Sequence, residues 1–257
     1  MAVRNSFTCD MLKVIVADSR EEMGKEAANR AGECIRKLLQ EKEEINMIFA
    51  AAPSQNETLK YLLQNENIDW TRINAYHMDE YVGLKSGSAQ SFAYYLHANI
   101  FGKAPFKSIN YIMPEGDAEK ECDRYEKLLC ENPVDVVMLG IGENAHIAFN
   151  DPWVAKFDDP RKVKVVELDP VCRQQQVNDG CFAALEDVPT HAVTLTIPAL
   201  LSAKHMFCTV PSMTKRNAVN ATVNGEFSEA IPATAMRKHP DAWMFVDSDS
   251  GKDLIKG

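Results

Sequence analysis

The chain has 257 residues, of which 46% are hydrophobic, and this composition supports a sizeable core and argues against disorder. Its formal net charge of −9 makes nucleic acids and anionic membranes poor partners, so an anionic small molecule would need a local basic pocket. The seven cysteines are scattered and form no C-x-x-C pair, so the usual signature of a disulfide framework or zinc site is missing.

The N-terminal ten residues are polar and have no apolar core of the kind found in signal peptides. No run of 18 apolar residues occurs in the chain, so we expect no membrane span and a cytoplasmic location. Residues 12–17 (LKVIVA) predict a first strand. Ser19 and Glu22 form a capping box, which predicts that a helix with one apolar face begins there.

Short apolar runs then alternate with stretches of helical period. We predict strands at residues 45–52, 73–78, 109–113, 134–141, 163–168, 192–197, 206–210 and 243–246, and helices at 58–64, 91–101, 118–130, 174–180 and 214–223. This alternation predicts an α/β fold with a mostly parallel sheet covered by helices on both faces, in a single domain over residues 1–257. Ligands of such sheets bind beyond the carboxyl ends of the strands, so the residues after each strand are the candidates for a site.

The strand predicted at 45–52 leads into Ser54, Gln55 and Asn56, just before a helix. Such a turn can direct backbone N–H groups and a helix dipole at an anion, although an ordinary N-cap explains the same residues. Lys215 likewise follows a predicted strand, either as a point charge for an anion or as one solvated lysine among many.

The strand predicted at 73–78 ends at two adjacent carboxylates, Asp79 and Glu80. Successive side chains of a strand point to opposite faces, so only one of the two can face a given pocket. A partly desolvated carboxylate at this position can act as a general base, and the alternative is an acid that caps a helix or meets a lysine.

The segment 140–152 (GIGENAHIAFNDP) follows the clearest buried strand. It matches G-x-G-x-x-A, but Pro152 leaves no room for the helix that a dinucleotide site needs, so we rank nucleotide binding low. The segment also places His146 between Asn144 and Asp151, either of which could orient the imidazole for acid/base work. The alternative for a single histidine is a satisfied core or surface residue.

Two strings, residues 78–84 (MDEYVGL) and 140–152, together resemble the signature segments of glucosamine-6-phosphate deaminases. The wider group includes 6-phosphogluconolactonases and has a Rossmann-like fold. The resemblance covers most of the chain and implies conversion of an amino-sugar phosphate into a ketose phosphate and ammonia, without metal or organic cofactor. It implies Asp79 as the base at C2, His146 as the proton carrier at the ring oxygen, and Asp151 as a carboxylate beside the histidine. It places the phosphate at the Ser54 turn with Lys215.

The chain departs from the family pattern at several of these positions. The usual phosphate turn Thr-Gly-Gly-Thr-Pro is replaced by residues 54–58 (SQNET). Asn144 stands for an acid, Ala145 for a glycine and Asp151 for a glutamate. The position of a phosphate-binding arginine matches Gln176, with Arg173 nearby as a substitute charge.

Three alternatives therefore stay open beside an amino-sugar-phosphate deaminase or isomerase. They are a lactonase of the same superfamily, which needs only His146, a sugar-phosphate-binding protein with weakened catalysis, and a nucleotide-binding enzyme that uses the turn at Gly140. A small-molecule sugar phosphate is the expected partner. The sequence leaves the sugar epimer undetermined and a homo-oligomer open.

Overall fold

The structure of the chain is a computed structural model that describes residues 3–85 and 87–255, so the outermost residues of the predicted domain lie outside the described part. The strands are β1 (Val3–Cys9), β2 (Leu12–Ala17), β3 (Ile45–Phe49), β4 (Ile73–His77), β5 (Asp79–Tyr81), β6 (Ser108–Asn110), β7 (Val136–Leu139), β8 (Val163–Glu167), β9 (His191–Leu195), β10 (His205–Val210) and β11 (Ala242–Val246). The α-helices are α1 (Arg20–Glu41), α2 (Asn56–Leu63), α3 (Phe92–Leu96), α4 (Ala118–Glu131), α5 (Pro170–Asn178), α6 (Ile197–Leu201) and α7 (Arg216–Asn224).

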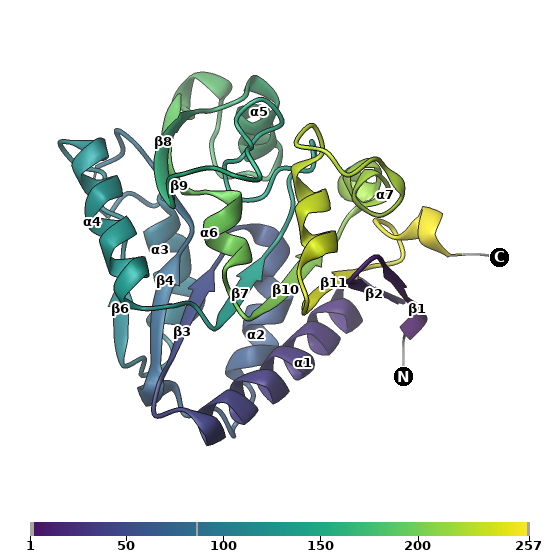
Figure 1. Cartoon of the computed structure of the whole chain (residues 1–257). Helices are drawn as coiled ribbons and strands as arrows, with labels where there is room; N and C mark the ends of the chain where they lie inside the picture. The colour runs from purple at the N-terminus through teal and green to yellow at the C-terminus, as the bar shows by residue number, and fades with distance from the viewer. Residues whose placement is uncertain (1–2, 86, 256–257) are drawn as a thin grey trace.

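An eight-stranded sheet in the order β1-β2-β11-β10-β7-β3-β4-β6 runs through the molecule (Figure 1). All neighbours in it pair in parallel except β1, which pairs antiparallel with β2. The α/β fold with a mostly parallel sheet is therefore confirmed. β7 lies near the middle of the sheet, so the loop after it reaches the centre of the carboxyl edge.

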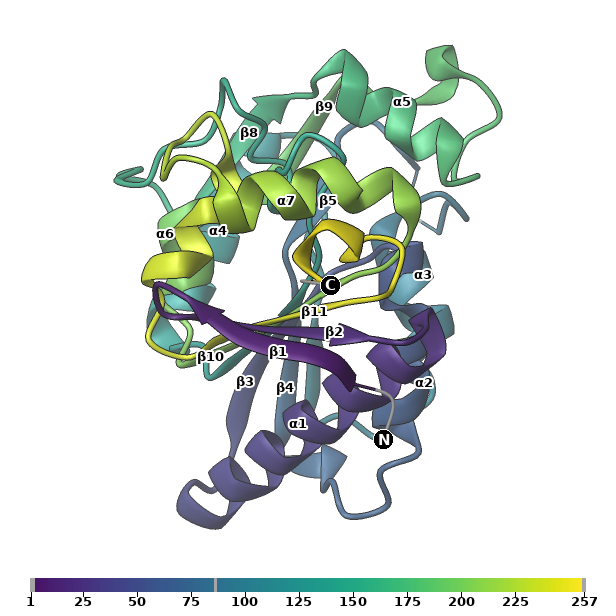
Figure 2. The ribbon, with the colours of Figure 1, turned by 90° about the vertical axis from the view of Figure 1, so that its right-hand side faces the viewer.

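Helices cover both faces of this sheet, as predicted. Alternate residues of each strand enter two separate cores, because successive side chains point to opposite faces. In β7, Val137 and Leu139 join one core with α4, α6 and α7, whereas Val136 and Met138 join the other with α1, α2 and α3. Figure 2 shows α7 on one side of the sheet and α1 and α2 on the other.

A second sheet of three antiparallel strands, in the order β5-β9-β8, lies beyond the carboxyl edge of the first and beside α5 (Figure 1). The sequence predicted β8 and β9 as strands, which is confirmed, but it did not predict this separate antiparallel sheet. Their apolar runs give the period of a strand but not its partner. β5 was missed because it has only three residues, two of them carboxylates, and they follow β4 after a single residue.

Helix α1 begins as the capping box predicts, since the Ser19 side chain accepts a hydrogen bond from the Glu22 N–H at 3.2 Å. Strand β1 was missed because the polar residues Arg4, Asn5 and Ser6 interrupt its apolar pattern, which suits a largely exposed edge strand. The predicted helix 91–101 is interrupted, with α3 followed by a π-helical turn over His97–Phe101. Within residues 3–85 and 87–255, no helix is both long and apolar enough to span a bilayer.

Candidate active site

Segments that follow four parallel strands meet in one pocket at the carboxyl edge of the main sheet. The turn after β3 contributes Ser54, β5 contributes Asp79, the loop after β7 contributes His146, and the turn after β10 contributes Lys215. Helix α5 adds Gln176 from the small sheet's side. The strand-end rule therefore brings Ser54, Asp79, His146 and Lys215 together, whereas Gln176 was expected from the family resemblance alone.

Asp79 is 6% exposed and lies in the pocket wall. Burial raises the pKa of its carboxyl well above the usual value, and the nearby Glu80 charge adds to the shift. A carboxylate that is hard to keep ionised is a stronger base when it does ionise, which suits proton removal from carbon.

Glu80 points away from this pocket. Its carboxylate accepts hydrogen bonds from the backbone N–H groups of Phe92, at 3.1 Å, and Ala93, at 2.8 Å, in the first turn of α3. The two adjacent acids thus divide as strand geometry predicts, with Asp79 in the pocket and Glu80 bound to a helix N-terminus.

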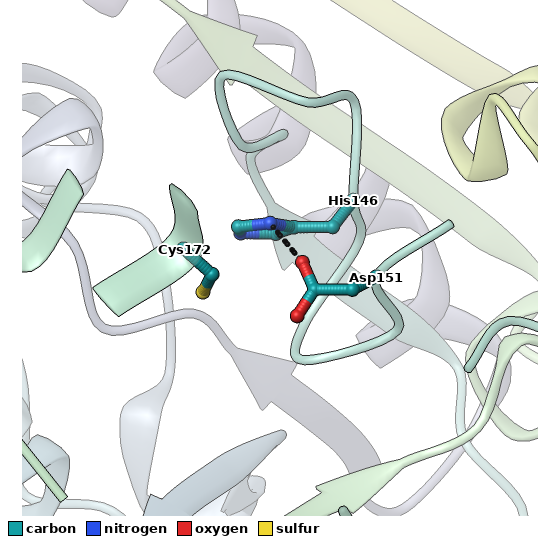
Figure 3. Close-up of side chains that lie close together, drawn as sticks. All are labelled: His146, Asp151 and Cys172. Carbon is teal, nitrogen blue, oxygen red and sulfur yellow. Dashed lines mark ion pairs between the residues drawn. The ribbon is translucent and has the colours of Figure 1, made fainter. Parts of the chain in front are cut away.

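His146 and Asp151 form a buried pair in the loop after β7 (Figure 3). The imidazole Nδ1 lies 3.0 Å from the Asp151 Oδ1, an ion-pairing distance for a protonated ring, although the N–H direction is too bent for a regular hydrogen bond. Asp151 also accepts from the Asn144 side-chain amide at 2.9 Å and from the Asp169 N–H at 3.3 Å. Burial alone would raise the pKa of Asp151, but the contacts with His146, Asn144 and Asp169 outweigh it and lower that pKa.

Asn144 reaches the imidazole only indirectly. Its Oδ1 accepts from the backbone N–H of His146 at 3.1 Å, and its amide donates to Asp151. Of the two orienting partners proposed from the sequence, Asp151 lies against the ring, and Asn144 positions Asp151 and the backbone of His146.

The loop after β7 brings the imidazole onto the backbone of Gly142. A Cβ at that position would lie 2.2 to 2.4 Å from three ring atoms of His146, so glycine is required for this approach. Ala145 has a φ of 65° and Ala148 a φ of 51°, so the turn around His146 keeps a left-handed backbone with alanine where glycine would adopt it more readily. No helix follows the glycines, which removes the structural basis for dinucleotide binding in the described part of the chain.

Two cations also line the pocket. Lys215 is 6% exposed, and burial lowers the pKa of its ammonium despite the opposing charges of Asp179 and Glu143. Arg20, in the first turn of α1, lies with its Nε 2.8 Å from the Glu57 Oε2 and also donates to the carbonyl of Pro53. Gly24 allows this arrangement, since a Cβ there would lie 2.4 Å from the Cβ of Glu57.

Three predicted binding residues do not line the pocket. The Gln55 amide donates to the carbonyl of Leu139 at 3.1 Å, and the Asn56 side chain accepts from the Tyr95 hydroxyl at 2.6 Å. The Arg173 guanidinium donates to the carbonyls of Leu185, at 2.7 Å, and Val188, at 2.8 Å. Their hydrogen bonds hold the surrounding chain instead, so Arg173 does not supply the charge that Gln176 lacks.

Sequence reasoning missed Arg20, Gln175 and Asp179, which all line the pocket. The position of Arg20 is itself a signal, since it follows β2 just as Ser54 follows β3. Gln175 and Asp179 lie in α5 and at its C-cap, where the family pattern indicated only Gln176.

A buried carboxylate, a histidine–aspartate pair and two cations around one pocket at the carboxyl edge of a parallel sheet define the site of an acid/base enzyme for a small anion. The sequence matches the family of glucosamine-6-phosphate isomerases/6-phosphogluconolactonase over residues 18–245. The chain belongs to this family.

Curated relatives are glucosamine-6-phosphate deaminases. The protein of Bacillus cereus (strain B4264) is 34% identical over 242 residues, which cover 93% of this chain and 88% of the relative. The protein of Streptococcus sanguinis (strain SK36) is also 34% identical over 242 residues, covering 93% and 97%.

Solved structures show the same fold. A monomeric glucosamine-6-phosphate deaminase superposes with a TM-score of 0.83 at 28% identity, covering 95% of this chain and 99% of that protein. A 6-phosphogluconolactonase from Thermotoga maritima gives a TM-score of 0.75 at 19% identity, covering 92% and 99%. At that identity the second likeness concerns the fold alone.

Proposed function

We propose that the protein converts an amino-sugar phosphate, glucosamine 6-phosphate or an epimer of it, into a ketose phosphate and ammonia. The observation that carries this proposal is that buried Asp79 and His146 line the same pocket as Lys215 and Arg20, while Asp151 holds His146 from behind. A lactonase would need the histidine and the cations but not a second, separately placed base.

The acid/base residues would divide the reaction between them. His146, held by Asp151, would take the proton of the anomeric hydroxyl and return one to the ring oxygen, which opens the sugar. Asp79 would remove the proton at C2 and deliver it to C1, passing through an enolamine. Water would then add to the resulting imine at C2, and ammonia would leave, so that the overall reaction consumes one water.

The phosphate would lie at the cationic end of the pocket. Lys215 would serve as a point charge and Arg20 as a planar donor, with the Ser54 hydroxyl between the two turns. Arg20 would therefore supply the phosphate-binding guanidinium that the family pattern has at the position of Gln176. Its salt bridge with Glu57 fixes the direction of the guanidinium but offsets part of its charge.

The test is to incubate the protein with glucosamine 6-phosphate and galactosamine 6-phosphate and to measure ammonia and ketose phosphate. Turnover of either that falls by at least about 100-fold in Asp79→Asn supports the proposal, since a positioned acid/base group contributes about 10²- to 10⁴-fold. Absence of turnover at high enzyme concentration would contradict it.

The same variant separates the alternatives. Hydrolysis of a 6-phosphogluconolactone that survives Asp79→Asn would favour a lactonase. A rise in melting temperature with a sugar phosphate, without turnover of any of these compounds, would favour a binding protein.

We further propose a cytoplasmic protein that folds as one domain, on the basis of the sequence features given above. A homo-oligomer stays an open prediction, and the monomeric deaminase among the similar structures favours a single chain. Light scattering of the purified protein tests this point directly.

A further inference from the structure

We propose that His146, Asp151 and Cys172 form a binding site for a zinc-like divalent cation, and that such a cation switches the enzyme off. All three ligands lie within the described residues 87–255. The loss of activity rests on the proposed function, because it assumes that His146 carries a proton in the reaction.

The three side chains offer their donor atoms to one another. A ring nitrogen of His146, a carboxylate oxygen of Asp151 and the sulfur of Cys172 all lie within 4.8 Å of one another (Figure 3). Ligand atoms around a tetrahedral zinc ion are about 3.3 to 3.6 Å apart, so the most widely spaced of the three atoms would move together by up to about 1.5 Å on binding.

The cluster comes from two elements that the small sheet brings together. His146 and Asp151 belong to the loop after β7, whereas Cys172 lies in the first turns of α5. The exposed fractions are 7% for His146, 0% for Asp151 and 1% for Cys172, so surface residues play no part. The separation of Cys172 from the other two in the sequence explains why no zinc motif was visible there.

The donor set suits zinc rather than magnesium. Imidazole nitrogen, thiolate sulfur and carboxylate oxygen are the three ligand types of zinc sites, and sulfur disfavours hard cations. Among the described residues, the imidazole Nδ1 is buried and has no hydrogen-bond partner of regular geometry. The reaction proposed above does not use the thiol of Cys172. Both groups are therefore available to a metal.

The catalytic pocket provides an entry path, because His146 itself lines it. An ion held by three protein ligands keeps a fourth position for water or substrate, and here that position would face the pocket. A metal bonded to Nδ1 would take the place of the ion pair with Asp151 that stabilises the protonated ring. The metal would thus take the histidine out of acid/base work and leave the phosphate end untouched.

The experiment is to titrate the chelator-treated protein with Zn²⁺ by calorimetry and with Co²⁺ by absorption spectroscopy. We expect one equivalent of each ion to bind and the Co²⁺ form to show a thiolate-to-cobalt charge-transfer band. Activity should fall in proportion to bound Zn²⁺ and return with chelator, whereas Mg²⁺ should have no effect.

Cys172→Ser tests the thiol, and Cys181→Ser, a thiol just beyond the same helix, is the matched control. Loss of a second-shell partner already weakens metal sites about 10- to 100-fold, so loss of this direct ligand should weaken Zn²⁺ binding at least about tenfold. The charge-transfer band should disappear in Cys172→Ser and persist in Cys181→Ser. Cys172→Ala serves as a second variant if the serine destabilises the buried position.

The outcomes separate this inference from the proposed function. A Co²⁺ band that depends on Cys172 supports the metal site even if no sugar phosphate is turned over. Zn²⁺ affinity and inhibition that are equal in the native protein and in both Cys172 variants would overturn it, as would binding without the charge-transfer band.

Discussion

Two buried carboxylates of the site have pKa shifts of opposite direction. Burial raises the pKa of Asp79, whose neighbour Glu80 is also acidic, whereas the pKa of Asp151 is lowered because His146, Asn144 and the Asp169 N–H outweigh its burial. Environments that separate two carboxyl groups in this way separate their roles as well. Asp79 is suited to receive a proton, and Asp151 is suited to remain ionised beside an imidazole.

The raised pKa of Asp79 predicts a stability effect. Between the unfolded value near 3.8 and the higher folded value, the folded state binds more protons, so stability falls as pH rises through this window. Asp79→Asn should therefore raise the free energy of unfolding near neutral pH, by about 1.4 kcal/mol for each unit of elevation, while activity is lost. Below the unfolded pKa the difference should vanish.

Thermal unfolding of the native protein and of Asp79→Asn at about pH 3.5, 5 and 7.5 measures this effect, because only the lowest value lies below the ordinary pKa of 3.8. A variant that is less stable than the native protein at neutral pH would contradict an energetically costly ionised Asp79.

The lowered pKa of Asp151 predicts the effect of Asn144→Asp. The substitution removes a hydrogen bond that favours ionised Asp151 and adds a like charge beside it, so the pKa of Asp151 should rise. Activity should be lost when Asp151 becomes protonated and no longer pairs with His146. A higher pKa of Asp151 should therefore move the acidic limb of kcat/KM to higher pH. Asn224→Asp, which adds the same charge at an exposed helix end, is the control. An acidic limb that coincides in both variants would show that Asn144 does not tune the pair.

At the scale of elements, the start of α1 contributes to the pocket as directly as the strand ends do. Arg20 lies in the first turn of this helix. Its guanidinium pairs with Glu57 and donates to the carbonyl of Pro53, in the turn after β3. The turn after β3 therefore has a cation beside it from a neighbouring helix.

Arg20→Gln should raise KM for the sugar phosphate with little change in kcat. A hydrogen bond to a charged group is worth about 1.5–3 kcal/mol, which corresponds to about 10- to 150-fold. The double variant with Glu57→Gln shows how much of the loss comes from the unpaired glutamate. Arg173→Gln is the matched control, and it should lower the melting temperature rather than raise KM, because Arg173 donates to backbone carbonyls. A KM unchanged by Arg20→Gln would place the phosphate elsewhere.

Gly142→Ala should remove activity by displacing the imidazole, since its Cβ would overlap the ring of His146. We expect a loss in kcat of about 100-fold or more, comparable to removal of an acid/base group. In the His146→Ala background the same substitution should cost nothing further, so the two effects should fail to add. Additive losses would mean that Gly142 acts through something other than the ring.

The sequence predicted most elements of the main sheet because its buried strands are continuous apolar runs and α1 has a clear cap. It predicted Asp79, His146, Ser54 and Lys215 as site residues because they follow strands or match the family strings, and Gln176 because it matches the family's arginine position. It could not predict the small sheet, because β5 is three residues long and antiparallel pairing leaves no mark in the apolar runs of β8 and β9.

At the scale of the whole molecule, β9 joins the two halves of the site. Thr194 pairs with Asp79 across the small sheet, and its hydroxyl accepts the Phe149 N–H at 3.0 Å from the histidine loop. Asn150 in the same loop donates to the Leu195 carbonyl at 2.8 Å. The base and the histidine therefore share one support outside the main sheet.

Thr194→Val should weaken this support. It leaves the buried N–H of Phe149 without an acceptor, which costs about 1–3 kcal/mol of folding free energy, and kcat should fall through misplacement of His146. Thr209→Val is the control, because the hydroxyl of Thr209 is buried without a partner among the described residues. Chemical denaturation and kinetics measure both. Equal stability and kcat in the two variants would show that β9 does not align the site.

The left-handed backbone at Ala145 also has an energetic consequence for the histidine loop. An alanine in this conformation costs about 1–2 kcal/mol that a glycine would avoid. The packing around the turn must supply that free energy, so the place of His146 against Gly142 depends on contacts outside the turn itself.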